Sequence, residues 1–295
     1  MSTPPSAFRG VQTYVIVVLV GTTIIAVLMH ARHVSVGEVR SLGFILAAMW
    51  MPGFARLIAT RTVDRGWHSP FPLRRWGHPA WLVVILPLAS VTAIYLGAYL
   101  LAALAGVERF SPAWSGGRLV ANIVVNLPLL SAIGIVGALG EEIGWRGYLQ
   151  PRLDELNVPY SLLWTIVAET LFHFPLILLA GYLGAKNLLA TLALFFTLGL
   201  GLTPLWTWAT YQFGTIWMAV LFHTFHNAVS QVIIPKALGE GDPLVLGESG
   251  VFPVIAYLSA GLIVFVIIRR RGPTWQRFAR TAIAPESSQS FVAGG

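Results

Sequence analysis

The sequence predicts an all-α fold, a polytopic membrane helical bundle of about eight transmembrane helices. The chain is 56% hydrophobic and only 11% charged, whereas a soluble domain carries about 25% charged residues. Its apolar residues form continuous runs long enough to cross a hydrocarbon core of about 30 Å, which takes roughly 20 helical residues. Continuous runs are typical of spanning helices, because the strands of a membrane barrel alternate apolar and polar residues.

The expected helices follow one another along the chain. They occupy residues 11–29, 41–60, 80–105, 118–142, 160–182, 187–211, 214–234 and 251–268. The first run is longer than the apolar core of an ordinary signal peptide, and no convincing small-residue cleavage site follows it, so we interpret it as a spanning helix. We expect residues 1–295 to form a single transmembrane domain that ends in a disordered tail at residues 281–295.

The basic residues predict how the chain is oriented in the membrane. With eight spans and a cytoplasmic N-terminus, thirteen of the 19 lysines and arginines fall on the cytoplasmic side and six on the other. This asymmetry is what the positive-inside rule requires. We therefore expect a multi-pass protein of the cell membrane with both termini in the cytoplasm.

Composition also excludes several classes of function. The sequence contains no cysteine, so disulfides, zinc fingers and thiol catalysis are excluded. Its net charge of +7 is compatible with nucleic acid binding. The basic residues, however, follow the membrane topology, and we expect a lipid bilayer and no nucleic acid among its partners.

Two adjacent carboxylates, Glu141 and Glu142, stand at the end of the fourth apolar run. Arg146 follows Glu142 by four residues, a spacing that places both on one face of a helix. Ionisable residues within membrane segments are energetically expensive, and they mark functional sites by default. A structural ion pair, or a glutamate pair that merely reaches the membrane interface, is the simpler alternative for each residue taken alone.

Two further polar clusters lie on later apolar runs. Glu169 and His173 are four residues apart on the fifth run, and His223 and Asn227 are four apart on the seventh, with His226 beside them. If the fourth helix continues past the glutamates toward Leu153, the three clusters can meet in a water-filled cavity open to the cytosol. The alternative for each histidine or asparagine alone is a hydrogen bond between helices.

Together these residue types suit peptide-bond hydrolysis. A glutamate in a poorly solvated site can take a proton from water and return it to a leaving amine. A histidine and an asparagine one helical turn apart present two hydrogen-bond donors on one face. Such donors stabilise the oxyanion of a tetrahedral intermediate, and each can contribute about 100-fold or more in rate.

The same residues resemble the motifs of the CPBP family, the CAAX-protease and bacteriocin-processing membrane proteins also called the Abi family. The family shows EExxxR, FxxxH and HxxxN or HxxxD on successive membrane helices. Here Glu141, Glu142 and Arg146 match the first motif, and His223 and Asn227 match the third. The resemblance covers residues 118–235. In the second motif His173 is present, but Glu169 stands where the family has phenylalanine.

The resemblance implies a bundle of about eight spans and a glutamate-dependent intramembrane endopeptidase. It implies that Glu141 activates water together with His173, that Glu142 pairs with Arg146, and that His223 and Asn227 stabilise the oxyanion. It further implies a membrane or lipidated peptide or protein as substrate. We expect no metal ion or other cofactor. Nothing in the sequence indicates a pocket for a prenyl group.

Two other functions remain open at this point. The first is a zinc-dependent intramembrane metallopeptidase that uses Glu141 or Glu142 with His173, His223 and His226 as ligands; these ligand types are adequate, but the chain has no HExxH. The second is a non-enzymatic membrane protein for immunity, scaffolding or transport that uses the polar cavity for binding.

The departure at Glu169 leads to a structural prediction. Glu169 lies one helical turn before His173 on the same face, and an ionised carboxylate facing lipid costs several kcal/mol. We therefore expect Glu169 to line the site, as an accessory residue, and to bind His173 or Arg146 directly or through water. The alternative is a protonated glutamate packed against a neighbouring helix.

Overall fold

The computed structural model describes residues 5–74, 76, 79–107, 110–184 and 187–271. The predicted tail at residues 281–295 lies outside this part of the chain. Each of the eight predicted ranges forms a helix, so the prediction of an all-α fold is confirmed. The eight main helices are α1 (Pro5–Ala31), α2 (Leu42–Thr62), α3 (Ala80–Leu104), α4 (Gly117–Gly144), α6 (Ser161–Leu179), α7 (Leu188–Phe213), α8 (Trp217–Ala228) and α10 (Val251–Arg271).

Short helical segments complete the chain. They are η1 (Val39–Ser41), η2 (Trp145–Leu149), α5 (Gln150–Glu155), η3 (Tyr182–Gly184), η4 (Val229–Ile233) and α9 (Ile234–Leu238). Within the described ranges, six helices are long and apolar enough to cross a membrane, and Val251–Ile267 forms a shorter apolar helix. The protein is therefore a polytopic helical membrane protein.

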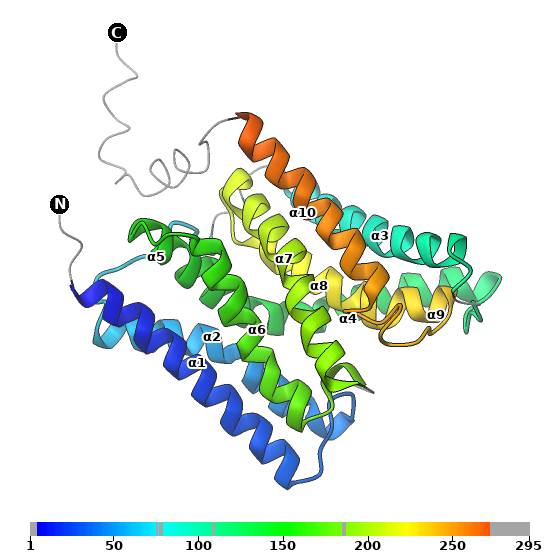
Figure 1. Ribbon diagram of the computed structural model, residues 1–295, viewed down its shortest axis with the longest axis horizontal. Coiled ribbons are helices and arrows are strands. Elements are labelled where there is room, and N and C mark those ends of the chain that lie inside the picture. The colour runs from blue at the N-terminus through cyan, green and yellow to red at the C-terminus, as the bar shows by residue number, and fades with distance from the viewer. Residues whose placement is uncertain (1–4, 75, 77–78, 108–109, 185–186, 272–295) are drawn as a thin grey trace.

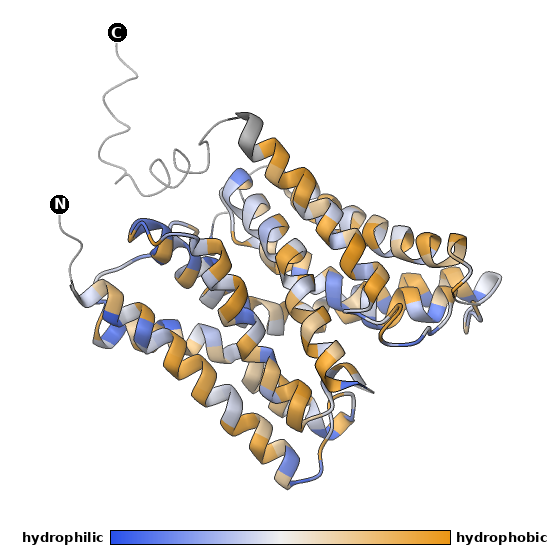
Figure 2. Ribbon diagram, viewed as in Figure 1, coloured by the Kyte–Doolittle hydropathy of each residue, from blue (hydrophilic) through white to orange (hydrophobic). Residues whose placement is uncertain are grey.

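Helix α8 lies in the middle of the bundle. It packs against α3, α4 and α7, while α1, α2 and α6 pack together on one side and α10 packs against α3 and α7 on the other (Figure 1). Hydrophobic residues predominate along α1, α3 and α10 (Figure 2), and large apolar side chains such as Ile16, Leu100 and Ile263 are exposed. Because hydrocarbon solvates such side chains, these surfaces fit contact with lipid.

Close packing of α4 against α2 determines which way the glutamates face. A Cβ atom on Gly144 would lie 2.3 Å from the Cβ of Pro52, and one on Gly140 would lie 2.8 Å from the carbonyl oxygen of Met49. Small residues four apart let two membrane helices approach at backbone distance. Glu141 and Glu142 are buried and face the centre of the bundle, since this glycine face is occupied by α2.

Candidate active site

The helix that carries the glutamates does not end with them. Helix α4 runs directly into η2 and α5, so one helix continues from Gly117 to Glu155. The predicted continuation toward Leu153 is confirmed. The segment η2 is a π-helical turn in which the Gln150 N–H donates to the Trp145 carbonyl. Such turns occur frequently at functional sites, and this one contains Arg146.

Arg146 lies between two carboxylates. Its Nη1 is 3.0 Å from Oε2 of Glu142 and 2.6 Å from Oε1 of Glu169. The Arg146 side chain is only 1% exposed. The Thr203 hydroxyl on α7 donates to Oε2 of Glu169 over 2.5 Å. Glu169 therefore lines the site and contacts Arg146, as the sequence predicts, and it brings α6 and α7 into the ion cluster.

His223 contacts both adjacent glutamates. Its Nδ1 is 2.9 Å from Oε1 of Glu142, and its Nε2 is 3.9 Å from Oε1 of Glu141. The ring of Trp206 lies 5.2 Å from the His223 ring. Glu142 thus binds both Arg146 and His223, whereas Glu141 has a 3.4 Å hydrogen bond from Trp145 Nε1. The two glutamates have different neighbours, although they are adjacent in sequence.

His173 enters the same space from α6. Its Nδ1 donates to the carbonyl oxygen of Glu169 over 2.8 Å. In a neutral imidazole this leaves Nε2 as the acceptor. The ring packs between Phe172, Tyr182 and Phe195, which hold its orientation.

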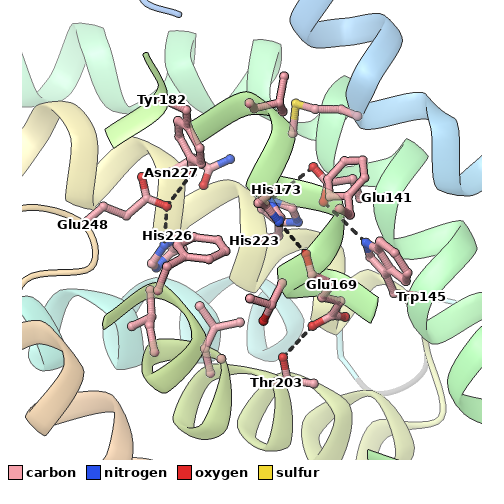
Figure 3. A pocket seen from close by; sticks show the side chains of 18 of the residues that line it. Glu141, Trp145, Glu169, His173, Tyr182, Thr203, His223, His226, Asn227 and Glu248 are labelled. Atoms are coloured by element: carbon pink, nitrogen blue, oxygen red, sulfur yellow. Dashed lines mark hydrogen bonds and ion pairs between the residues drawn. The ribbon is translucent and has the colours of Figure 1, made fainter. Parts of the chain in front are cut away.

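A single cavity of about 170 Å³ connects these side chains. It has room for several water molecules, because one water needs about 10–15 Å³ of such volume. The predicted site residues all line it, namely Glu141, Glu142, Arg146, Glu169, His173, His223, His226 and Asn227. Figure 3 shows the two histidines His173 and His223 near its centre. The structure thus brings the three sequence clusters together.

The direction of the cavity differs from the expectation. The sequence predicts an opening to the cytosol, the side on which both termini are expected. The loop residues that line the cavity are instead Val36, Tyr182 and Glu248. Their connections lie at the opposite end of the bundle from the start of α1 and the end of α10 (Figure 1). The cavity therefore reaches toward that end of the bundle.

Four residues at or next to the cavity have no counterpart in the sequence motifs, namely Tyr182, Gln231, Glu248 and Tyr257. Glu248 accepts hydrogen bonds from Tyr182 and Gln231, and His226 lies between Glu248 and Tyr257. Sequence reasoning missed Glu248, and the signal that the sequence offers for it is a carboxylate in a largely apolar chain. Its connection to the site depends on long-range packing that no helical spacing reports.

The ligand set of the zinc alternative is divided between two places. His223 binds Glu142, whereas His226 is bound to Tyr257 and Glu248. Within the described ranges, no three histidine, aspartate or glutamate side chains form a group that could hold a metal ion. The donor geometry therefore suits hydrogen bonding more than zinc coordination.

The fold and the cavity define a class: a multi-pass helical membrane protein with buried glutamates, histidines and an asparagine around a small polar space. Residues 123–229 match the family model described as Rce1-like, type II CAAX prenyl endopeptidase. The chain therefore carries a domain of this protease family, to which intramembrane proteolysis is attributed. The matched residues contain every predicted site residue and lie inside the interval 118–235. No curated protein matches the chain.

Proposed function

We propose that the protein is an intramembrane endopeptidase in which Glu141 activates the attacking water. The observation that carries the proposal is the unequal environment of the two glutamates. Glu142 is held by Arg146 and His223, so its oxygens are engaged. Glu141 lines the cavity outside that ion pair, and its carboxylate is the one left to accept a proton from water.

The chemical step follows from the donors around the cavity. Glu141 takes one proton of water while the water oxygen attacks the carbonyl carbon of the peptide bond. The lone pair on His173 Nε2 accepts the second hydrogen of that water and orients it. The proton on Glu141 then passes to the peptide nitrogen, the C–N bond breaks, and a carboxylic acid and an amine form. The acid gives its proton to the amine, so a carboxylate and an ammonium leave, and Glu141 is again an ionised carboxylate.

The oxyanion requires donors that face it. With protons on both ring nitrogens, His223 donates from Nδ1 to Glu142 and from Nε2 to the oxyanion. Asn227 follows one helical turn later and also lines the cavity, so its amide supplies the second donor. Two such preorganised donors stabilise a tetrahedral intermediate more strongly in a buried site than they would in bulk water. The substrates are membrane-embedded or lipid-linked polypeptides, since the site lies within a helical membrane bundle.

To test this proposal, the full-length protein is reconstituted in vesicles and cleavage of the peptides of a membrane peptidome is measured. Glu141→Gln, His173→Ala and His223→Ala should each abolish cleavage, because each removes a group used in the chemical step. Glu240→Gln is the matched control, since Glu240 is exposed and pairs with Lys236 outside the cavity. Cleavage that persists in Glu141→Gln contradicts the proposal.

A chelator separates the proposal from the zinc alternative. Activity should survive 1,10-phenanthroline, because the mechanism uses carboxylate, imidazole and amide groups alone. Inhibition by phenanthroline that added zinc reverses would establish the metallopeptidase instead. Absence of cleavage by the unmodified protein, with or without added zinc, would favour a binding or scaffolding role.

A further inference from the structure

A carboxylate stands on the wall of the cavity away from Glu141. Glu248 lies in the connection between α9 and α10, and its side chain is 8% exposed. It lines the same cavity as Glu141, and Figure 3 shows the two carboxylates on opposite sides of His173 and His223. Glu248 also lies beyond residues 123–229, the part of the chain that matches the protease family.

Three side chains hold this carboxylate in place. The Tyr182 hydroxyl donates to its Oε1 over 2.8 Å, Gln231 Nε2 donates to its Oε2 over 2.8 Å, and His226 Nε2 lies 3.3 Å from Oε1. Hydrogen bonds to the charged form of a carboxyl group favour that form, and all three contacts can donate to an anion. Glu248 is therefore a fixed, ionised group.

His226 does not supply a full positive charge to balance it. The Tyr257 side chain is fully buried, so its hydroxyl hydrogen needs an acceptor. The acceptor that the structure offers is His226 Nδ1, 2.8 Å from the hydroxyl oxygen. A ring that accepts at Nδ1 and donates from Nε2 to Glu248 is a neutral imidazole.

The cavity as a whole carries more negative than positive groups. Four glutamates line it, and against them stand the His223 imidazolium, which binds Glu142, and the Arg146 guanidinium, with no other lysine or arginine among the described lining residues. That guanidinium already lies between Glu142 and Glu169. A buried carboxylate without a cationic partner is energetically expensive, and a ligand that brings a cation offsets this energy.

We propose that Glu248 is a specificity-determining residue that binds a cationic nitrogen of the peptide substrate, an ammonium or a guanidinium, close to the scissile bond. This inference rests on the proposed peptidase function. The carboxylate accepts charge-assisted hydrogen bonds from the cation, and the surrounding carboxylates disfavour an anionic group at the same place. Glu141 and Glu248 line one cavity of about 170 Å³, so a peptide bond at Glu141 places its neighbouring side chains in the space that Glu248 also lines.

A peptide library tests the inference with the full-length protein in vesicles. The peptides carry lysine, arginine, acetyl-lysine, norleucine or glutamate at each of the three positions on either side of the cleaved bond, and all have acetylated N-termini. We expect cleaved sites to be enriched in lysine and arginine at one position, and acetyl-lysine to be as poor as norleucine. A second set with free N-termini distinguishes an α-amino group from a side chain as the source of the cation.

Variants at two carboxylates of the same connection provide the matched comparison. Glu248→Gln should lower cleavage of the lysine peptides relative to the norleucine peptides by at least about tenfold, because a charge-assisted pair is lost. Glu248→Asp should retain the preference. Glu240→Gln should leave both rates unchanged, since this exposed carboxylate pairs with Lys236.

The outcomes separate this inference from the proposed function. Absence of a cation preference in the unmodified protein overturns the role of Glu248, and this result needs no variant to fold. An equal loss for lysine and norleucine peptides in Glu248→Gln also overturns it, because that loss indicates a structural role. Failure of the unmodified protein to cleave any peptide, in contrast, overturns the peptidase itself.

Discussion

Arg146 and Arg152 lie on one continuous helix, and each contacts two carboxylates, yet they belong to different kinds of site. Arg146 lies between Glu142 and Glu169, and its side chain is 1% exposed. Arg152 lies 2.6 Å from Asp64 and 2.5 Å from Glu155, and its side chain is 13% exposed. The pattern of charges is the same in both.

Each arginine and its two carboxylates form a cluster, the Arg146 cluster and the Arg152 cluster, and the residues that surround the two clusters differ. The carboxylate Glu142 also binds His223, and the cluster lines the cavity. Around Arg152, the additional donors are the Tyr148 hydroxyl to Asp64 and Trp67 Nε1 to Glu155. Tyrosine and tryptophan do not exchange protons near neutral pH. An arginine between two carboxylates therefore indicates an active site only where proton carriers and a cavity accompany it.

The largest expected difference follows from removing each arginine. Arg146→Gln leaves two buried carboxylates without their cation, which costs about 3–5 kcal/mol of stability and disorders the site. Cleavage per folded molecule should fall by at least about 100-fold, the scale of a lost preorganised donor. Arg152→Gln should lower thermal stability, while its cleavage per folded molecule stays within about twofold of that of the unmodified protein. A twofold change corresponds to much less than the 1.4 kcal/mol of a tenfold change. Equal losses in both variants would remove the distinction between the clusters.

Replacement of Asn227 removes the second proposed oxyanion donor of the cavity. Asn227→Ala should lower kcat by about 100-fold with a small change in KM, because the amide is needed in the transition state. Glu155→Gln, which weakens the Arg152 cluster, serves as the comparison and should leave kcat unaltered. Steady-state kinetics on one library peptide measure both. A change in KM alone for Asn227→Ala would assign this residue to substrate binding.

Glu169 should show an intermediate effect. Glu169→Phe introduces the residue usual in the family and removes one of the two carboxylates on Arg146. We expect a several-fold lower rate or a shifted pH optimum, because the charge beside the catalytic groups changes. Glu169→Gln keeps the side-chain shape and separates charge from packing. Full activity and an unaltered pH profile in both variants would make Glu169 a neutral variation.

The smallest expected effect on activity comes from reporter fusions, which show on which side of the membrane a chosen residue lies. They thereby orient the Arg146 and Arg152 clusters relative to the membrane. The arginine asymmetry predicts that fusions after residue 70 and after Arg271 both report the cytoplasm. The Arg152 cluster contacts the segment before residue 70 through Asp64, so it then lies toward the cytoplasm, and the Glu248 end of the cavity faces away from it. An external signal from either fusion contradicts this orientation.

The sequence by itself predicted the features that depend on local spacing and on hydrocarbon burial. The apolar runs placed all eight helices, because a backbone in lipid must satisfy its own hydrogen bonds. The four-residue spacing of Glu142 and Arg146 predicted their ion pair. The energetic expense of a carboxylate facing lipid predicted that Glu169 turns inward. The assigned roles of these residues remain predictions.

Only the tertiary structure decided how the elements rotate and which distant groups meet. The glycine face of α4 against Pro52 and Met49 on α2 turns Glu141 toward the cavity. The contact of Arg146 with Glu169, the direction of the cavity and the enclosure of Glu248 by Tyr182 and Gln231 depend on packing between helices far apart in the chain. Helical periodicity describes one element at a time, whereas these contacts depend on side-chain fit between several elements, which no spacing within one run reports.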